Sequence, residues 1–299
     1  MKPPNETKTL ITFWGTRGSI STPGRTTEKY GGNTPCVTVT HADTSIILDA
    51  GTGIRNLGID LVENSGSGNS PLSLHLFLSH THWDHIQGLP FFQPAYIRDT
   101  QLTIYGSPRK ERFLDSVLED QMDYEYFPIA MSALTAEISI HEISEEIIQV
   151  GPVVIDWQEQ IYHPGGSVRY GLNINGKRIV YATDVELDKI FKVNPKNEET
   201  EALSEEYLSF ISNADLLIAD GQYTEEEYTI KIGWGHSSIP VVIDTAKQAG
   251  VKRLAIFHHD PQHSDSFLDD MWMKNRSGSH SKGHHMELFW AREGMTLSI

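Results

Sequence analysis

The sequence is poor in cysteine, in basic residues and in long apolar runs. Its 299 residues include one cysteine, Cys36, so no disulfide bond can form within the chain. Such a composition is expected in a reducing compartment. No apolar stretch approaches the roughly 20 residues that span a bilayer, and residues 1–8 lack the apolar segment of a secretory signal. These absences predict a cytoplasmic protein that does not enter a membrane.

Basic residues are outnumbered by acidic ones. The 24 Lys and Arg residues face 40 Asp and Glu residues, which gives a formal net charge of −16. This balance argues against a broad surface that follows the phosphates of long DNA or RNA. It does not exclude a small anionic substrate, because the charge of a bound metal can dominate a site. The length suits one large domain or two modest ones, and the 38% hydrophobic content indicates a real core. We expect a single domain that covers residues 1–299.

The segment His80–His85, with the sequence HTHWDH, is the most informative stretch that is present. It places three imidazoles and one carboxylate directly after the apolar run Leu72–Leu78. A single His after a strand is usually a surface or hydrogen-bonded residue, but these groups together suit a divalent metal such as zinc. Four of them are too many for one open site that also draws ligands from elsewhere. The segment therefore predicts two adjacent metals and hydrolysis by a metal-activated water.

Short apolar runs bounded by turn residues predict the secondary structure. Helical patterns fall between them, at Arg109–Asp120, Ser204–Ser212 and Ile239–Ala249. This order predicts an α/β domain in which two sheets lie between helices. The predicted strands are Leu10–Trp14, Cys36–Thr40, Ser45–Leu48, Leu72–Leu78, Leu102–Tyr105, Val153–Trp157, Arg178–Tyr181, Leu216–Ala219, Arg253–Phe257 and Met286–Trp290.

Further candidate ligands follow several of these strands. They are His163, Asp184, His236 and the run His258-His259-Asp260. Each alone is more often a cap or turn residue than a ligand. Their shared placement favours a common site, because the carboxyl ends of strands in α/β folds meet in one crevice.

Together these motifs resemble the metallo-β-lactamase superfamily of dinuclear hydrolases. The resemblance runs from Phe13–Ser19 to Phe257–Pro261. It implies an αββα sandwich of two mixed β-sheets flanked by helices, with the metals at the edge of the paired sheets. The motifs that carry it are His80-x-His82-x-Asp84-His85, Ile47–Gly53, His163-Pro164-Gly165, Tyr181–Asp184 and Gly235–Ser238.

The resemblance also implies a role for each ligand. Asp184 would bridge the two metals through one carboxylate. His259 is a rival to His258, which we prefer because it comes first after its strand. Asp49 either orients the His80–His85 segment or caps the glycine-rich turn that follows it. The first metal would be held by His80, His82 and His163, and the second by Asp84, His85 and His258.

A separate pair of residues points to one branch of the superfamily. The sequence Gly-His-Ser-Ser around His236 resembles the His-Ser-Thr motif of the ribonuclease Z-like and cyclic phosphodiesterase-like branch. There a non-ligand His contacts the phosphate and assists the leaving oxygen. Asp220 would orient this ring and favour its imidazolium form, although the family usually has Glu at that place. We assign catalytic roles to His236, Asp220 and Asp84.

The resemblance thus implies a dinuclear metal-dependent phosphodiesterase. A hydroxide bridging the metals would attack a small phosphodiester, such as a cyclic nucleotide or cyclic phosphate. The chain lacks the long basic arm that clamps transfer RNA, so no long nucleic acid is expected. Zinc is the metal we expect first, while manganese or iron also suits mixed His and Asp ligands. Related enzymes are often dimers, which makes a homodimer one expected assembly. A carboxylic ester, lactone or thioester hydrolase of the glyoxalase II type is the alternative, and a metal-stabilised binding module is a third reading.

Specificity is expected to come from other segments. The loop Thr16–Asn33 carries Arg17, Arg25 and Lys29, which either meet an anion or belong to a loop that covers the sheet edge. The polar stretch 274–285 contains His280, His284 and His285, and its composition favours a solvated loop over a metal site. Aromatic residues either stack on bases or belong to the core: Trp83, Phe91, Phe92, Tyr96, Tyr124, Tyr126, Phe127, Tyr223 and Trp234.

Overall fold

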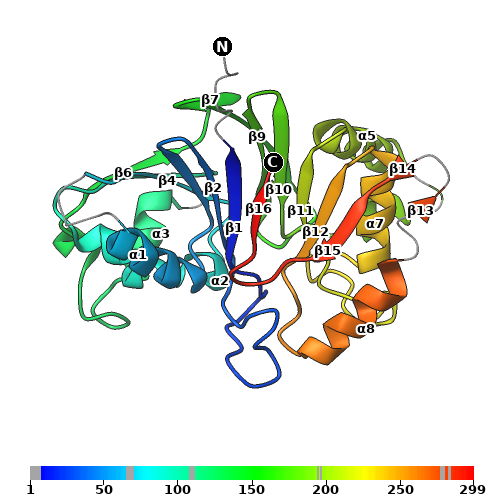
Figure 1. Ribbon diagram of the computed structural model, residues 1–299, viewed down its shortest axis with the longest axis horizontal. Coiled ribbons are helices and arrows are strands. Elements are labelled where there is room, and N and C mark those ends of the chain that lie inside the picture. Colours follow the sequence, from blue (N-terminus) through cyan, green and yellow to red (C-terminus); the bar gives the residue numbers. More distant parts are fainter. Residues whose placement is uncertain are drawn as a thin grey trace, which may run out of the picture.

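Two seven-stranded sheets pack face to face, and helices cover their outer faces (Figure 1). The computed structural model describes residues 8–64, 71–107, 112–193, 195, 197–276, 280–281 and 284–299. Both sheets contain parallel and antiparallel pairs, so the predicted αββα sandwich of two mixed sheets is confirmed.

The first sheet is built mainly by the first half of the chain, in the order β16-β1-β2-β3-β4-β5-β6. Neighbours are antiparallel from β16 to β3 and parallel from β3 to β6. The parallel part places the carboxyl ends of β3 and β4 at one edge. The strands are β1 (Thr9–Gly15), β2 (Cys36–His41), β3 (Thr44–Leu48), β4 (Ser73–Leu78), β5 (Gln101–Gly106), β6 (Glu137–Glu142) and β16 (Thr296–Ser298).

The second sheet has the order β15-β12-β11-β10-β9-β8-β7. Its parallel part runs from β10 to β15, so the carboxyl ends of β10, β11 and β12 also share one edge. The remaining pairs are antiparallel. The strands are β7 (Ile147–Val150), β8 (Val153–Gln160), β9 (Ser167–Ile174), β10 (Lys177–Ala182), β11 (Leu216–Asp220), β12 (Arg253–Phe257) and β15 (Glu287–Trp290).

The helices divide between the two outer faces. Helices α1 and α3 lie on the side of the first sheet, and α5, α7 and α8 lie on the side of the second (Figure 1). No helix in the described ranges is long and apolar enough to cross a membrane. The helices are α1 (Gly53–Asn64), α2 (Trp83–Ile86), α3 (Leu114–Asp120), α4 (Asp188–Phe191), α5 (Glu198–Ile211), α6 (Glu225–Tyr228), α7 (Ile239–Gln248) and α8 (Asp265–Arg276), with 3₁₀ turns η1 (Leu89–Phe91), η2 (Gln93–Tyr96) and η3 (Met131–Ala133).

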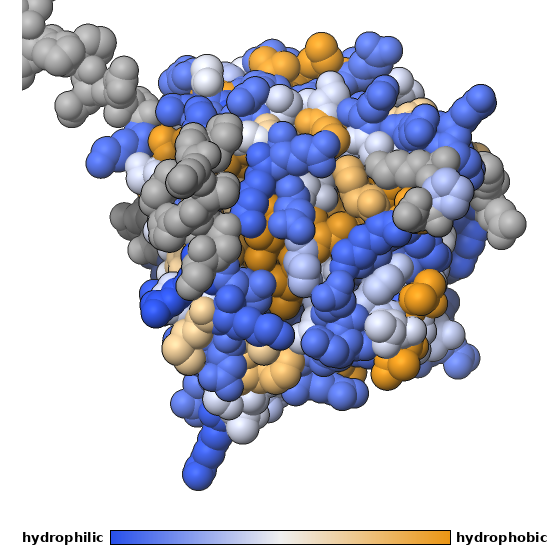
Figure 2. Space-filling view, turned by 90° about the vertical axis from the view of Figure 1, so that its right-hand side faces the viewer, coloured by the Kyte–Doolittle hydropathy of each residue, from blue (hydrophilic) through white to orange (hydrophobic). Residues whose placement is uncertain are grey.

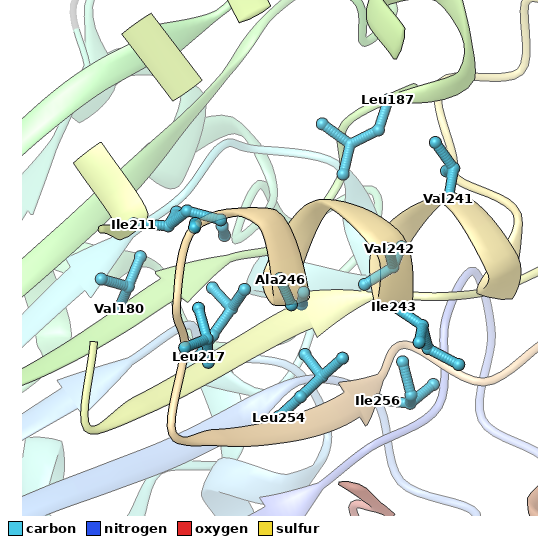
Figure 3. Close-up of a cluster of buried hydrophobic side chains, with 14 of the residues drawn as sticks. Val180, Leu187, Ile211, Leu217, Val241, Val242, Ile243, Ala246, Leu254 and Ile256 are labelled. Carbon is cyan, nitrogen blue, oxygen red and sulfur yellow. The ribbon is translucent and has the colours of Figure 1, made fainter. Parts of the chain in front are cut away.

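Three apolar layers hold this arrangement together. One lies between the sheets, where Phe77 and Tyr170 meet edge to face. A second lies under α1 and α3. In the third, α7 places Val242 and Ala246 over Leu217 and Leu254 of the second sheet (Figure 3). The outer face on the side of α7 is mostly hydrophilic with smaller apolar areas (Figure 2). Each sheet therefore directs apolar side chains toward the inter-sheet layer on one face and toward the helices on the other.

The predicted elements are found, but several boundaries differ. All ten predicted strands overlap an observed strand. The helix predicted from Arg109 begins at Leu114, and residues 109–111 lie outside the described residues. The helix predicted from Ser204 begins at Glu198, because Asn197 and Thr200 form a capping box there. The sequence prediction missed strands β6, β7, β9 and β16 and helices α1, α2, α4, α6 and α8.

The His-rich stretch also differs from the predicted loop. Its first residues complete α8, which ends at Arg276. Beyond them, His280–Ser281 (β13) and His284–His285 (β14) pair as a short antiparallel ribbon. The side chains of these residues lie outside the described part of the structure. The backbone pairing nevertheless replaces the predicted solvated loop at these four positions.

Candidate metal centre

The candidate ligands lie where the parallel strands of both sheets end. The His80–His85 segment follows β4, Asp184 follows β10, Asp220 ends β11 and His258 follows β12. This edge is the lower one in Figure 1, where α2 lies beside the loop that follows β1. The predicted crevice of chemically active residues therefore exists, and each sheet contributes to it.

Three imidazoles form a first cluster. His82 Nδ1 lies 2.9 Å from His80 Nε2 and 3.0 Å from His163 Nε2. The His163 ring donates its Nδ1–H to the carbonyl oxygen of Gly235 at 2.9 Å. A carbonyl only accepts, so the Nε2 of a neutral His163 carries a lone pair directed at the other rings. Lone pairs that face one another at this distance suit a cation between them.

A second cluster joins Asp84, His85 and His258. Asp84 Oδ2 lies 3.2 Å from the Nε2 atoms of both His85 and His258, and these two nitrogens are 3.3 Å apart. His85 donates its Nδ1–H to Asp49 at 2.8 Å, and His258 directs its Nδ1 to Gln222 Oε1 at 2.9 Å. Both Nε2 atoms are thus held as acceptors toward the cluster, which is the arrangement that metal-binding His residues need.

Asp184 lies between the two clusters. Its Oδ2 is 3.3 Å from His85 Nε2, and its Oδ1 is 3.5 Å from His258 Nε2, both in the second cluster. The same Oδ1 is 3.7 Å from His80 Nε2 and 3.8 Å from His163 Nε2, in the first cluster. One buried carboxylate therefore contacts both groups, as a bridging ligand must. All seven predicted ligands meet at this place.

The ionisation states fit a metal centre. Burial lowers the pKa of His80, His163 and His82, that of His82 to about 4. Burial opposes ionisation of Asp84 and Asp184, but the neighbouring His rings outweigh it and hold the pKa of both carboxyls well below the usual range. Neutral imidazoles and ionised carboxylates are the forms that bind metal.

His85 is the exception within the set. Burial disfavours its charged form, yet Asp184, Asp84 and Asp49 together raise the pKa of this ring well above its ordinary value. Three carboxylates around one imidazole create a negative potential that favours a positive charge at this position. The residues therefore fit divalent cations, because a metal ion supplies that charge at the centre of the second cluster.

Asp49 supports the His80–His85 segment, one of its two predicted roles. This buried residue accepts hydrogen bonds from Ser79 N at 2.7 Å and Ser79 Oγ at 2.8 Å. It also accepts from the Tyr181 hydroxyl at 2.7 Å and from His85 Nδ1. Four donors on one carboxylate fix both the start of the segment and the direction of the His85 ring.

The Asp220–His236 pair lies beside these clusters. Asp220 Oδ2 is 2.7 Å from His236 Nδ1, so the shorter Asp reaches the ring without difficulty. Burial lowers the pKa of His236, although Asp184 and Asp84 act in the opposite direction. Burial also raises the pKa of the Asp220 carboxyl well above its ordinary value. The contact between Nδ1 and Oδ2 therefore holds one proton between ring and carboxyl, and Nε2 is the nitrogen left to act toward substrate.

The centre opens into a cavity of about 450 Å³. It contains ligands from both clusters together with the side chain of His236, and Trp83 forms part of its wall with 82% of its surface exposed. Ser19 lies on the rim, with its backbone N–H donating to Asp84 Oδ2 at 2.8 Å. The lining residues are Ser19, Thr81, His82, Trp83, Asp84, Asp184 and His236.

Several predicted candidates lie elsewhere. His259 Nε2 donates to the carbonyl of Ala291 at 2.8 Å, so His258 is the residue that joins the centre. The carboxylate of Asp260 pairs with Lys231 at 2.8 Å. Arg17 is fully buried and donates to the backbone carbonyls of Gly31, Asp260 and His263. It holds the Thr16–Asn33 loop in place, and its Nη2 lies 3.9 Å from the carboxylate of Asp265.

The aromatic candidates also separate into different environments. Phe92 belongs to the core under α1, while Tyr96 donates to the carbonyl of Pro90. Phe91 and Phe127 contact each other edge to face, outside the residues that line the cavity. Trp83 is the member of the predicted set that lines it.

Sequence reasoning missed three contributors to the centre. Ser19 acts through its backbone N–H, so its side-chain type gives no signal. Gln222 supports His258, and its position two residues after Asp220 at a strand end could have suggested a role. Glu186 is buried behind the first cluster with 1% of its surface exposed. It stands two residues after Asp184, where a second acid in the same turn was the available sequence signal.

Comparisons with known proteins agree with this architecture. A family model described as "Beta-lactamase superfamily domain" matches residues 44–259. Ribonuclease Z of Brevibacillus brevis is 24% identical over 222 residues, which cover 64% of this chain and 69% of that protein. The metallo-beta-lactamase fold protein YhfI from Bacillus subtilis superimposes with a TM-score of 0.67 at 18% identity, over 98% of this chain and 100% of YhfI.

A third similarity is to unliganded yeast PDE1, with a TM-score of 0.66 at 16% identity over 98% of this chain and 100% of PDE1. The family model covers the strands that carry Asp49, the His80–His85 segment, Asp184 and His258. The predicted family and fold are therefore confirmed. This chain belongs to the beta-lactamase superfamily and is a hydrolase of the metallo-β-lactamase fold.

Proposed function

We propose that this protein is a phosphodiesterase that uses two divalent metal ions to hydrolyse a small phosphodiester, such as a cyclic nucleotide or cyclic phosphate. His80, His82 and His163 would hold one ion, and Asp84, His85 and His258 the other. Asp184 would bridge them. Ions bound there would supply Lewis acidity and an activated water. Residues 1–299 would act as one domain, because the two sheets contribute ligands to the same centre.

The Asp220–His236 pair is the observation that carries the phosphodiester assignment. Hydrolysis of a phosphodiester builds negative charge on the oxygen that leaves. The Asp220 carboxylate, 2.7 Å from Nδ1, orients the His236 ring, and the ring lines the cavity beside Asp184. With a bound anionic phosphodiester favouring the imidazolium form, Nε2 would carry the proton that passes to the leaving oxygen. Hydrolysis of a carboxylic ester or thioester at the metals would not require this pair.

A small substrate is supported by the size and charge of the molecule. The cavity of about 450 Å³ suits a mononucleotide-sized ligand. The net charge of −16 opposes the approach of a long polyanion. The relative from Brevibacillus brevis bears the name of a ribonuclease, which supports phosphodiester chemistry while leaving substrate length to experiment. We therefore do not expect long nucleic acids to be substrates.

A substrate panel tests the proposal. The protein would be loaded in turn with zinc, manganese or iron and offered bis-p-nitrophenyl phosphate, cyclic mononucleotides and nucleoside 2′,3′-cyclic phosphates. A lactone and a thioester serve as competing substrates. We expect the protein to hydrolyse the phosphodiesters, and we expect zinc to support this activity better than manganese or iron. Efficient thioester or lactone hydrolysis without phosphodiester turnover would favour the glyoxalase II-like alternative.

The His236→Ala variant separates the two reaction classes. We expect a fall in phosphodiester kcat by about 10²–10⁴, the range for a positioned proton donor, with two metals per chain retained. Metal content must be measured, because His236 also lies within 4.8 Å of Asp184 and His163 ligand atoms. Loss of a metal would identify His236 as a ligand, and an unchanged kcat would remove the basis for the phosphodiester assignment.

A further inference from the structure

We propose that Glu186 is a positioning residue that sets the directions of both His163 and His236. It lies two residues after Asp184, in the turn between β10 and α4. Its carboxylate is almost completely buried, with 1% of the side chain exposed. A buried carboxylate is stable only when its oxygens are well satisfied, so its partners reveal what it holds. The inference rests on the proposed two-metal site but concerns how this chain builds it.

The partners of Glu186 belong to the segment that leads to His236. Oε1 accepts from the Tyr228 hydroxyl at 2.7 Å and from the backbone N–H of Gly233 at 2.8 Å. Oε2 accepts from the N–H of Gly235 at 3.3 Å and faces Lys189 Nζ at 3.2 Å. Two backbone amides on one carboxylate fix the local path of the chain directly before His236.

The two glycines have backbone conformations that need such support. Gly233 has a φ of 90° and Gly235 a φ of 87°, both in the region that side chains disfavour. A Cβ atom on Gly235 would lie 2.4 Å from His163 Nδ1. The chain therefore passes directly against the His163 ring. This close approach lets the Gly235 carbonyl accept from His163 Nδ1 and so fix the tautomer that leaves Nε2 for the first cluster.

Glu186 also holds His163 through its own backbone. Its N–H donates to the carbonyl of Tyr162, the residue before His163, at 2.9 Å. The imidazole is thus fixed from two directions by one residue, through the chain at Tyr162 and through the carbonyl of Gly235. The second cluster has no such link to Glu186, because His85 and His258 are oriented by Asp49 and Gln222. Loss of the carboxylate should therefore act on the first cluster.

Neighbouring residues extend this connection toward α7. Ser237 Oγ donates to the carbonyl of Val185 at 2.6 Å, and Asp188 accepts from Ser238 N at 2.8 Å and Ser238 Oγ at 2.7 Å. Leu187 lies near Val241 at the first turn of α7 (Figure 3). The turn that begins with Asp184 is therefore joined along its length to the segment that carries His236. Glu186 is the member whose contacts reach the glycines beside His163.

Glu186→Gln tests the inference with little change of shape. The amide oxygen can still accept from Tyr228 and Gly233, but an NH₂ group then faces the Gly235 N–H, donor against donor. We expect the affinity for one of the two metals to fall about 10–100-fold, the usual effect of losing a supporting contact behind a metal ligand. The other metal should bind as in the wild type. Metal content after dialysis against graded chelator gives both affinities.

Two controls separate positioning from general stability. Tyr228→Phe removes one hydrogen bond from the same carboxylate but leaves both glycine contacts, and it should keep both metals. Asp188→Asn alters an equally buried acid of the same turn that does not contact Gly233 or Gly235. It should lower the Tm without selective loss of one metal. Imidazole ¹⁵N spectra of metal-stripped Glu186→Gln should show His163 Nδ1 losing its fixed proton.

The outcomes distinguish this inference from the proposed function. If the wild type binds two metals and Glu186→Gln binds both with unchanged affinity, the inference is overturned while the two-metal site stands. If the wild type binds fewer than two metals, both fail. Equal weakening of both metals in Glu186→Gln, or equal losses in all three variants, would also overturn the inference. Each would show that the residue acts on global stability.

Discussion

His258 Nδ1 lies 2.9 Å from the side-chain oxygen of Gln222, and the opposite ring nitrogen of His258 faces Asp84. His258 also has a backbone φ of 60°, a strained conformation that persists only where the surrounding structure holds the residue in place. Gln222 comes from the loop after β11, whereas His258 follows β12. A neighbouring strand therefore determines which nitrogen His258 offers to the second cluster.

Gln222→Leu should weaken metal binding at this cluster. Leucine preserves much of the volume but cannot accept from Nδ1, so the His258 ring is free to change tautomer or turn. We expect about 10–100-fold weaker binding of one metal, measured by competition with a chelator. Gln222→Glu retains an acceptor and should bind both metals. If the leucine variant matched the wild type, the Gln222 contact would have no part in holding His258.

Asp184→Ala should have a larger effect than the loss of any supporting residue. Its carboxylate approaches ring nitrogens of both clusters at 3.3–3.8 Å. Removing it would take a ligand from each metal and leave His85 with one carboxylate fewer. We expect phosphodiester turnover to be abolished and fewer than two metals to be retained per chain. Full activity with two bound metals would refute the bridging assignment.

The sequence predicted the centre better than it predicted the scaffold behind it. His80, Asp184 and His258 could be found because each follows an apolar strand that is easily recognised. Glu186 was missed, because the glycines that its carboxylate holds, Gly233 and Gly235, lie about 50 residues later in a loop whose path no local pattern describes. Ser19 contributes a backbone N–H, a group that every residue except proline carries. Supporting contacts of this kind depend on tertiary structure and have no signature of their own.

The secondary-structure elements of the fold were also predicted unevenly from the sequence. Strands were predicted because their apolar runs fill the layers on both sides of each sheet. Helix α1 was missed although Ile54 and Leu57 lie on its buried side, because Gly53 and Gly58 weaken the helical signal. A Cβ on Gly58 would lie 3.0 Å from the Phe92 ring. Helix α8 was missed because it buries little beyond Leu268. Packing, and not intrinsic preference, therefore stabilises α1.

Trp83→Ala should change substrate binding more than the chemical step. The indole is 82% exposed, lines the cavity with His236 and carries no group that can act on the reacting atoms. Stacking on a base contributes about 1–3 kcal/mol, so we expect KM for a cyclic nucleotide to rise about 10-fold or more while kcat stays close to the wild-type value. A dialkyl phosphodiester, which has no ring, should be turned over equally by both proteins.

Phe113→Ala provides a matched control for this variant. Phe113 is also a largely exposed aromatic residue, at 69%, but it is not among the residues that line the cavity of the metal centre. It should leave both kinetic constants unchanged. Equal KM values for the wild type and Trp83→Ala on every nucleotide substrate would exclude Trp83 as a stacking surface.

The acid stability of the protein should depend on Asp215, far from the metal centre. Burial opposes ionisation of this residue, but hydrogen bonds from Lys252 Nζ and the backbone N–H of Arg178 outweigh it. Together with the charge of Lys177 they hold the pKa of the carboxyl below its ordinary value. A carboxyl with a lowered folded-state pKa stabilises the protein above its unfolded-state pKa, and this contribution is lost as the pH falls through the folded-state value.

Asp215→Asn should therefore be less stable than the wild type between pH 5 and 8, by on the order of 1 kcal/mol because the lysines are solvent-exposed. The difference should shrink as the pH falls below the unfolded-state value of about 4 and toward the lowered folded-state pKa, where the folded wild-type carboxylate takes up its proton. Urea unfolding at a series of pH values measures it. Asp244→Asn removes an exposed carboxylate, 3.6 Å from Lys247, and should show no comparable loss. A difference for Asp215→Asn that grew toward low pH would have the opposite sign and contradict this account.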